Sequence, residues 1–156
     1  MCMAVYAAAD APLPLVEWDT AQPAFNVHPL EPRDEPVRRH FTRPFVVFVG
    51  AHTGCACGFA YGAFAPRDDL ERAEDARARA SVTALRRYLT AAVAELGVVE
   101  LFSCWEGDQG AEARHRLEVG PDHFGGEAFE FPEKAYFVVH RAPPGAAPRR
   151  RRSGRS

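Results

Sequence analysis

The chain has 156 residues, 47% of them hydrophobic, and a formal net charge of −2 at pH 7. This length and apolar fraction predict one ordinary domain with a hydrophobic core. Residues 145–156 contain five arginines and no acidic residue, so without their charge the remaining chain carries −7. An acidic body is a poor surface for duplex nucleic acid, because that binding depends on a basic face.

The sequence also indicates the compartment. No stretch approaches the roughly 20 apolar residues that a membrane span needs. The opening "MCMAVYAAADAPLPLV" has no basic start and contains Asp10 and two prolines, so it does not resemble a signal peptide. We therefore expect a cytoplasmic protein whose thiols stay reduced. Abundant alanine, and arginine in place of lysine, are typical of a GC-rich bacterial genome.

The first part of the chain is predicted to form three strands and a short helix. "MAVYAAA", residues 3–9, is a short apolar run typical of a strand, and residues 24–30 indicate a second one. Residues 33–41 favour a short helix with Asp34 as its N-cap. Residues 45–50, "FVVFVG", are continuously apolar, which predicts a central strand buried on both faces.

The clearest predicted element is a long helix from Asp69 to Leu96, a stretch without proline or glycine. Its apolar residues recur at helical spacing, and Gly97 is a natural C-cap. The charged first half, "DDLERAEDARARA", is expected to project past the core into solvent. Ser81 offers an alternative N-cap that would divide the helix in two.

Strands are predicted again after the helix, at residues 98–105 and 134–141, with a hairpin of residues 114–119 and 127–131 between them. A strand, a long helix and a strand in succession predict a crossover between two parallel neighbouring strands. The expected class is therefore α+β (mixed α/β): one mixed sheet, a long amphipathic helix packed across it and a βαβ crossover in its centre.

The domain is predicted to span residues 1–142, followed by a disordered basic tail at 143–156. The tail "GAAPRRRRSGRS" has no aliphatic side chain larger than alanine with which to pack. Its arginines suggest weak contact with an anionic partner, although a solvated tail is the simpler interpretation. The sequence indicates no other partner.

The residues that carry chemistry are the four cysteines. Cys55 and Cys57 lie one residue apart in "AHTGCACGF", directly after the strand at 45–50. Cys104 ends the strand at 98–105, and parallel strands end at the same edge of a sheet. If the first strand runs antiparallel to both, Cys2 also lies at that edge. All four thiols then converge.

Such a convergence predicts a metal site, most simply a zinc site. Four thiolates arranged tetrahedrally around one zinc ion form a closed structural site. The spacing departs from zinc ribbons, which use C-x₂₋₄-C twice, whereas this chain has one C-x-C and two single cysteines. His52 is an alternative ligand in place of Cys2. Thiolates also suit iron–sulfur clusters and Cu(I).

Two other interpretations stay open. Cys55 or Cys57 can serve as the nucleophile of a thiol-dependent redox or transfer enzyme, with His52 as base. Alternatively, Cys2 and Cys104 are buried core residues of an interaction domain, since free cysteine behaves as a small hydrophobe. The Met-Cys start also resembles that of class II glutamine amidotransferases, but the resemblance covers only those two residues.

Overall fold

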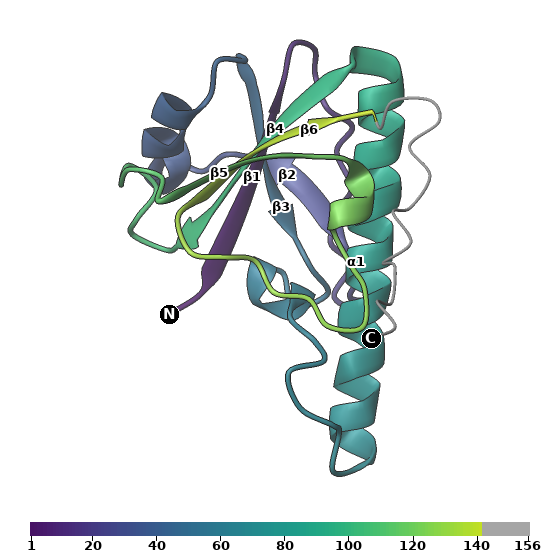
Figure 1. The fold of residues 1–156 in the computed structure, drawn as a ribbon. Helices are drawn as coiled ribbons and strands as arrows, with labels where there is room; N and C mark the ends of the chain where they lie inside the picture. Colours follow the sequence, from purple (N-terminus) through teal and green to yellow (C-terminus); the bar gives the residue numbers. More distant parts are fainter. Residues whose placement is uncertain (142–156) are drawn as a thin grey trace, which may run out of the picture.

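The computed structural model of the protein describes residues 1–141 (Figure 1). The predicted tail at 143–156 lies outside these residues. The described part contains six strands, one α-helix and three short 3₁₀ helices: β1 (Met3–Ala9), β2 (Asn26–Pro29), η1 (Pro32–His40), β3 (Phe45–Gly50), η2 (Ala56–Phe59), α1 (Asp69–Leu96), β4 (Val98–Trp105), β5 (His115–Val119), η3 (Pro121–His123) and β6 (Ala135–His140).

The strands form one mixed sheet in the order β2-β3-β1-β4-β6-β5. Neighbours pair antiparallel except β5 and β6, which are parallel. With α1 packed against the sheet, this confirms the α+β class. The prediction that β3 and β4 are neighbours is wrong. They run in the same direction, but β1 lies between them and pairs with both, so the crossover through α1 passes over one strand.

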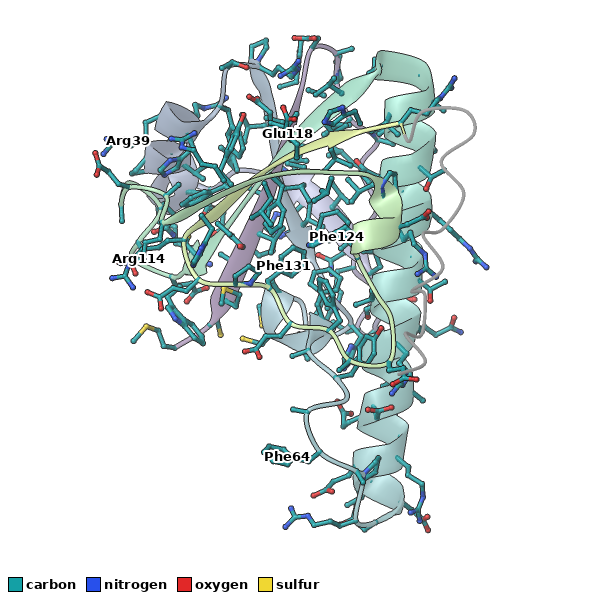
Figure 2. The ribbon with its side chains drawn as sticks, viewed as in Figure 1. Arg39, Phe64, Arg114, Glu118, Phe124 and Phe131 are labelled. Carbon is teal, nitrogen blue, oxygen red and sulfur yellow. The ribbon has the colours of Figure 1, made fainter. Side chains whose placement is uncertain are left out.

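One face of the sheet carries the main core. The apolar stripe of α1 packs there, over alternate residues of the central strands, and the aromatic residues Phe124 and Phe131 fill the space beside it (Figure 2). The helix boundaries follow from local signals. The Asp68 side chain accepts a hydrogen bond from the backbone N–H of Glu71 at 2.8 Å, and Gly97 closes the helix at φ 83°.

The opposite face carries a second, smaller core that η1 covers. Because side chains alternate along a strand, Tyr6 and its neighbours two residues away point to this face. The Tyr6 hydroxyl donates to Asp34 of η1 at 2.6 Å, and the Gln109 amide donates to the same hydroxyl at 3.3 Å. Nearby, the fully buried carboxylate of Glu100 accepts hydrogen bonds from Thr42 and Tyr136. The Tyr6–Asp34 contact holds η1 on the sheet, and the contact of Thr42 with Glu100 holds the segment that follows η1.

Three predicted details are corrected by the structure. The helix predicted at 33–41 is a 3₁₀ helix that begins at Pro32, with Glu31 as N-cap and Asp34 three residues further on. Ser81 does not divide the long helix, because it lies buried within it. Of the predicted hairpin, residues 115–119 pair in parallel with β6, and 127–131 make only an isolated bridge to Tyr61.

The first turns of α1 extend beyond the sheet, as their charged sequence predicts (Figure 1). Acidic and basic side chains pair along this projecting part, for example Arg67 with Glu71 and Arg79 with Asp75. Phe64 and Leu70 are 91% and 79% exposed there. Within residues 1–141, no helix is both long enough and apolar enough to cross a membrane.

Candidate metal centre

Three cysteines meet at one edge of the sheet. The sulfur atoms of Cys2, Cys55 and Cys57, the thiol cluster, all lie within 4.8 Å of one another. Cys2 precedes β1, and the other two lie in the loop that follows β3. Because β1 runs antiparallel to β3, the start of one strand and the end of the other reach the same edge. The topology therefore joins two segments about 50 residues apart in the sequence.

The cysteine loop, residues 51–60, is held in place by its backbone. Ala51 N–H donates to the carbonyl of Cys55 at 3.0 Å, and Gly54 N–H donates to that of Ala51 at 2.9 Å. Gly54 has a φ of 83°, a conformation that glycine adopts without steric cost. Phe59 at the end of η2 is fully buried and anchors the loop in the main core. The two thiols therefore sit on an ordered turn.

Residues from two other segments complete the support of the loop. The side-chain amide of Asn26 donates to the Ala51 carbonyl at 2.9 Å, and the indole N–H of Trp18 donates to the His52 carbonyl at 3.1 Å. Sequence analysis missed both residues. Their partners are backbone carbonyls about 25 to 34 residues away, and no sequence spacing records such a contact.

Two hydrogen bonds fix the start of the chain, one to the cysteine loop and one to the end of β4. Met3 N–H donates to Cys57 Sγ at 3.1 Å, and Glu106 N–H, just past the end of β4, donates to the Cys2 carbonyl at 2.8 Å. An N–H aimed at sulfur stabilises a thiolate. Such donors around the ligand atoms are typical of metal–thiolate sites.

The thiols differ in acidity. Partial burial raises the pKa of Cys55, but hydrogen bonds from Thr53, from the Cys57 backbone and from the neighbouring thiols outweigh it and bring that pKa below its ordinary value. The pKa of Cys2 is raised, first by its hydrogen bond to Cys55 and then by the negative charge that Cys55 and Cys57 carry as thiolates. Three thiolates so close together repel one another, and a cation between them removes that repulsion.

The cluster fits a soft cation. With Zn–S bonds near 2.3 Å, tetrahedral thiolates lie about 3.8 Å apart, so sulfurs already within 4.8 Å need to move little. Three thiolates leave one position for water or an added ligand. Cys57 is exposed and borders a cavity of about 640 Å³, which His52 and the first turns of α1 also line.

Two residues predicted for the site lie apart from the thiol cluster. His52 uses both ring nitrogens elsewhere: Nδ1 lies 3.2 Å from the Ser81 hydroxyl, and Nε2 lies 3.1 Å from a carboxylate oxygen of Glu74. The same Ser81 hydroxyl accepts from His52 N–H at 3.1 Å. His52 therefore anchors the cysteine loop to α1. A polar residue on the buried face of a helix, as Ser81 is, was the one sequence signal for this contact.

Cys104 is the other residue that the structure does not bring to the thiol cluster. It lies at the expected edge, but its side chain belongs to the second core, on the face opposite α1, whereas η2 packs in the main core. Cys104 is fully buried, and this burial raises the pKa of its thiol to about 12. The interpretation of Cys104 as a core residue therefore agrees with its position.

Comparison of the chain with protein-family models, with curated proteins and with solved structures finds no match in any of the three. The function therefore has to be inferred from the chemistry of the site.

We expect Cys55, Cys2 and Cys104 of the metal-free protein to differ in their rate of alkylation with iodoacetamide. Because the pKa of Cys55 is lowered, a larger fraction of its thiol is ionised at pH 7, and it should react before Cys2, whose pKa is raised. Cys104 should stay unmodified until the protein unfolds. Mass spectrometry of the peptides against pH measures each rate. Equal rates at Cys55 and Cys2 would contradict the described hydrogen bonds.

Proposed function

We propose that this protein is a metal-binding domain in which the thiolates of Cys2, Cys55 and Cys57 hold one zinc ion. The observation that supports this proposal is the gathering of three sulfurs from two distant segments within 4.8 Å. Hydrogen bonds from Met3 N–H and from the Cys57 backbone to these sulfurs favour the charged form that a metal needs.

The number of thiols favours zinc over an iron–sulfur cluster. Such clusters are held by four protein ligands, usually all cysteines, and the fourth cysteine of this chain is buried on the other face of the sheet. Zinc accepts three protein ligands and a water, and Cu(I) is the other soft ion that thiolates select. The predicted cytoplasmic location, which keeps the thiols reduced, is part of the same proposal.

With only three protein ligands, the proposed zinc site has an open coordination position. A closed structural zinc site uses four, whereas an open position allows an added ligand to bind the metal. Cys57 is the most exposed thiol of the cluster and borders the large cavity beside α1. We infer that a ligand of the metal, water or a small thiol, enters from this side.

The decisive experiment is elemental analysis of the full chain purified without added metal. We expect about one zinc per chain, and less than about 0.2 in the double variant Cys55→Ser/Cys57→Ser, since zinc binding needs these ligands. Cys104→Ala is the matched control and should keep the metal, because its side chain lies in the second core. Copper at the same stoichiometry would correct the metal and keep the site.

Metal content that is low in the unmodified chain and unchanged in the double variant would overturn the proposal. Equal loss of metal in Cys104→Ala would also contradict it, because the site would then include a residue that the structure places elsewhere. Circular dichroism of each variant separates loss of metal from loss of fold.

A second candidate function is thiol–disulfide exchange, favoured by the closeness of the Cys2 and Cys55 sulfurs, which lie within 4.8 Å of each other. The Cys55 thiolate would attack a disulfide substrate and release one substrate thiolate. Cys2 would then attack Cys55 Sγ and release the second, leaving a Cys2–Cys55 disulfide. The substrate gains two electrons and two protons, and the protein thiols supply both.

Measurements on the same purified protein distinguish metal binding from thiol–disulfide exchange. Stoichiometric metal, with slow reduction of a small chromogenic disulfide until a chelator is added, supports the metal site. Protein without metal that reduces the disulfide at once, and loses this activity in Cys2→Ser, supports exchange.

A further inference from the structure

A second cavity lies between the end of η1 and the start of β5, and none of its residues belongs to the thiol cluster. Its volume is about 340 Å³, and its lining is almost wholly polar or charged: Arg39, His40, Glu112, Ala113 and Arg116. Figure 2 shows Arg39 on the side of the molecule away from α1. Two separate elements thus bring cationic side chains to one hollow.

Both arginines of this cavity are without a carboxylate partner within residues 1–141. Seven arginines in residues 1–141 have a carboxylate within 4.0 Å, namely Arg33, Arg38, Arg43, Arg67, Arg72, Arg77 and Arg79. The other six arginines of this range have no such partner, and Arg39 and Arg116 are two of them, although Glu112 lines the same cavity. Both guanidinium groups lower the pKa of His40, after the larger effect of its burial. The hollow therefore holds net positive charge on an otherwise acidic body.

The cationic groups are also held in position. The guanidinium of Arg39 donates to the carbonyl of Gly110, and that of Arg116 lies over the Tyr136 ring, 5.2 Å from its centre. His40 stacks on Phe102 with ring centres 3.8 Å apart. Groups that are ordered before a ligand arrives lose less freedom when it binds.

The orientation of His40 assigns a role to each ring nitrogen. Nε2 lies 2.8 Å from the carbonyl of Gln109, which can only accept, so Nε2 carries the hydrogen. Nδ1 is then the atom that takes up a proton and donates to an anion when one is present. Two guanidinium forks and one imidazole offer more donors than the two oxygens of a carboxylate can accept. A tetrahedral phosphate supplies the larger number of oxygens.

We propose that this cavity binds the phosphate group of a small phosphate monoester through Arg39, Arg116 and His40. Arginine forks suit phosphate oxygens, and a bound anion removes the repulsion between the two guanidinium groups. Glu112 at the wall accepts a hydrogen bond from a hydroxyl of the ester and disfavours a ligand that carries a second anionic group beside the phosphate.

Isothermal titration calorimetry with inorganic phosphate and with glycerol phosphate tests the site, with acetate as the carboxylate control. We expect a dissociation constant of about 1 mM or tighter for glycerol phosphate, and weaker binding of acetate. Arg39→Gln and Arg116→Gln should each weaken phosphate binding about tenfold or more, since each removes a charge-assisted hydrogen bond. Arg114→Gln is the matched control: it removes the same charge two residues from Arg116, and Arg114 does not line the cavity.

If a variant folds poorly, a measurement on the unaltered protein tests the same proposal. In NMR spectra, glycerol phosphate should shift the ring resonances of His40 and leave those of His28, on strand β2 at the other end of the sheet order, unchanged. Absence of binding up to about 50 mM, a loss in Arg114→Gln equal to that in Arg116→Gln, or equal shifts at both histidines would overturn the proposal.

Discussion

Zinc added to the metal-free protein should raise its melting temperature by about 8–16 °C when free zinc is 1,000 times its dissociation constant. A ligand that binds only the folded state stabilises it by about 4.1 kcal/mol at that ratio. In a domain of this size each kcal/mol corresponds to about 2–4 °C. Thermal unfolding followed by circular dichroism, with and without zinc, measures the shift.

Variants of the cysteines make this expectation specific. Cys55 and Cys57 stay close together in the unfolded chain, but Cys2 joins them only when β1 pairs with β3. Cys2→Ser should therefore lose most of the zinc-dependent rise. Cys104→Ala should lower the baseline melting temperature, because it removes a buried side chain, and keep the rise. A zinc effect that is independent of Cys2 would contradict the proposed ligand set.

The largest loss of stability is expected at Glu100 in β4. Its carboxylate is fully buried and accepts hydrogen bonds from the Thr42 hydroxyl at 2.7 Å, the Thr42 N–H at 3.1 Å, the Arg43 N–H at 3.2 Å and the Tyr136 hydroxyl at 2.6 Å. Glu100→Ala leaves these donors without their acceptor and leaves Arg43 without its buried counter-charge. We expect the free energy of unfolding to fall by about 3–5 kcal/mol.

Urea denaturation at pH 7 measures this change in the free energy of unfolding. Two further variants are compared with Glu100→Ala. Glu118→Ala removes an exposed carboxylate of β5 and should change stability by no more than about 0.5 kcal/mol. Tyr136→Phe removes one of the hydrogen bonds to Glu100 and should fall between the two. A loss in Glu100→Ala no larger than that in Glu118→Ala would show that the buried carboxylate is not needed to hold the segment before β3.

Several elements could be predicted from local patterns alone. The bounds of β1, β3 and α1 agree with the predicted ranges. Their signals lie within the element itself: a continuous apolar run for a central strand, and helical spacing between Asp68 and Gly97 for the helix. The projection of the charged first half of α1 follows in the same way, since those residues have nothing apolar to bury.

The pairing of the strands could not be predicted in this way. The insertion of β1 between β3 and β4, and the parallel pairing of β5 with β6, depend on contacts between residues far apart in the chain. A strand pattern records which residues share a face, but not which strand lies beside it. The contacts of His52 with Ser81 and Glu74 are non-local for the same reason.

The candidate metal site shows how much of a site can be predicted from the sequence. The C-x-C loop after a buried strand and the antiparallel direction of the first strand were enough to expect Cys2, Cys55 and Cys57 at one edge of the sheet. Cys104 reaches the same edge, but the pleat turns its side chain to the face that η1 covers, while η2 carries the loop to the face of α1. Strand order and direction choose the edge, whereas the packing of helices on the two faces chooses which thiols meet.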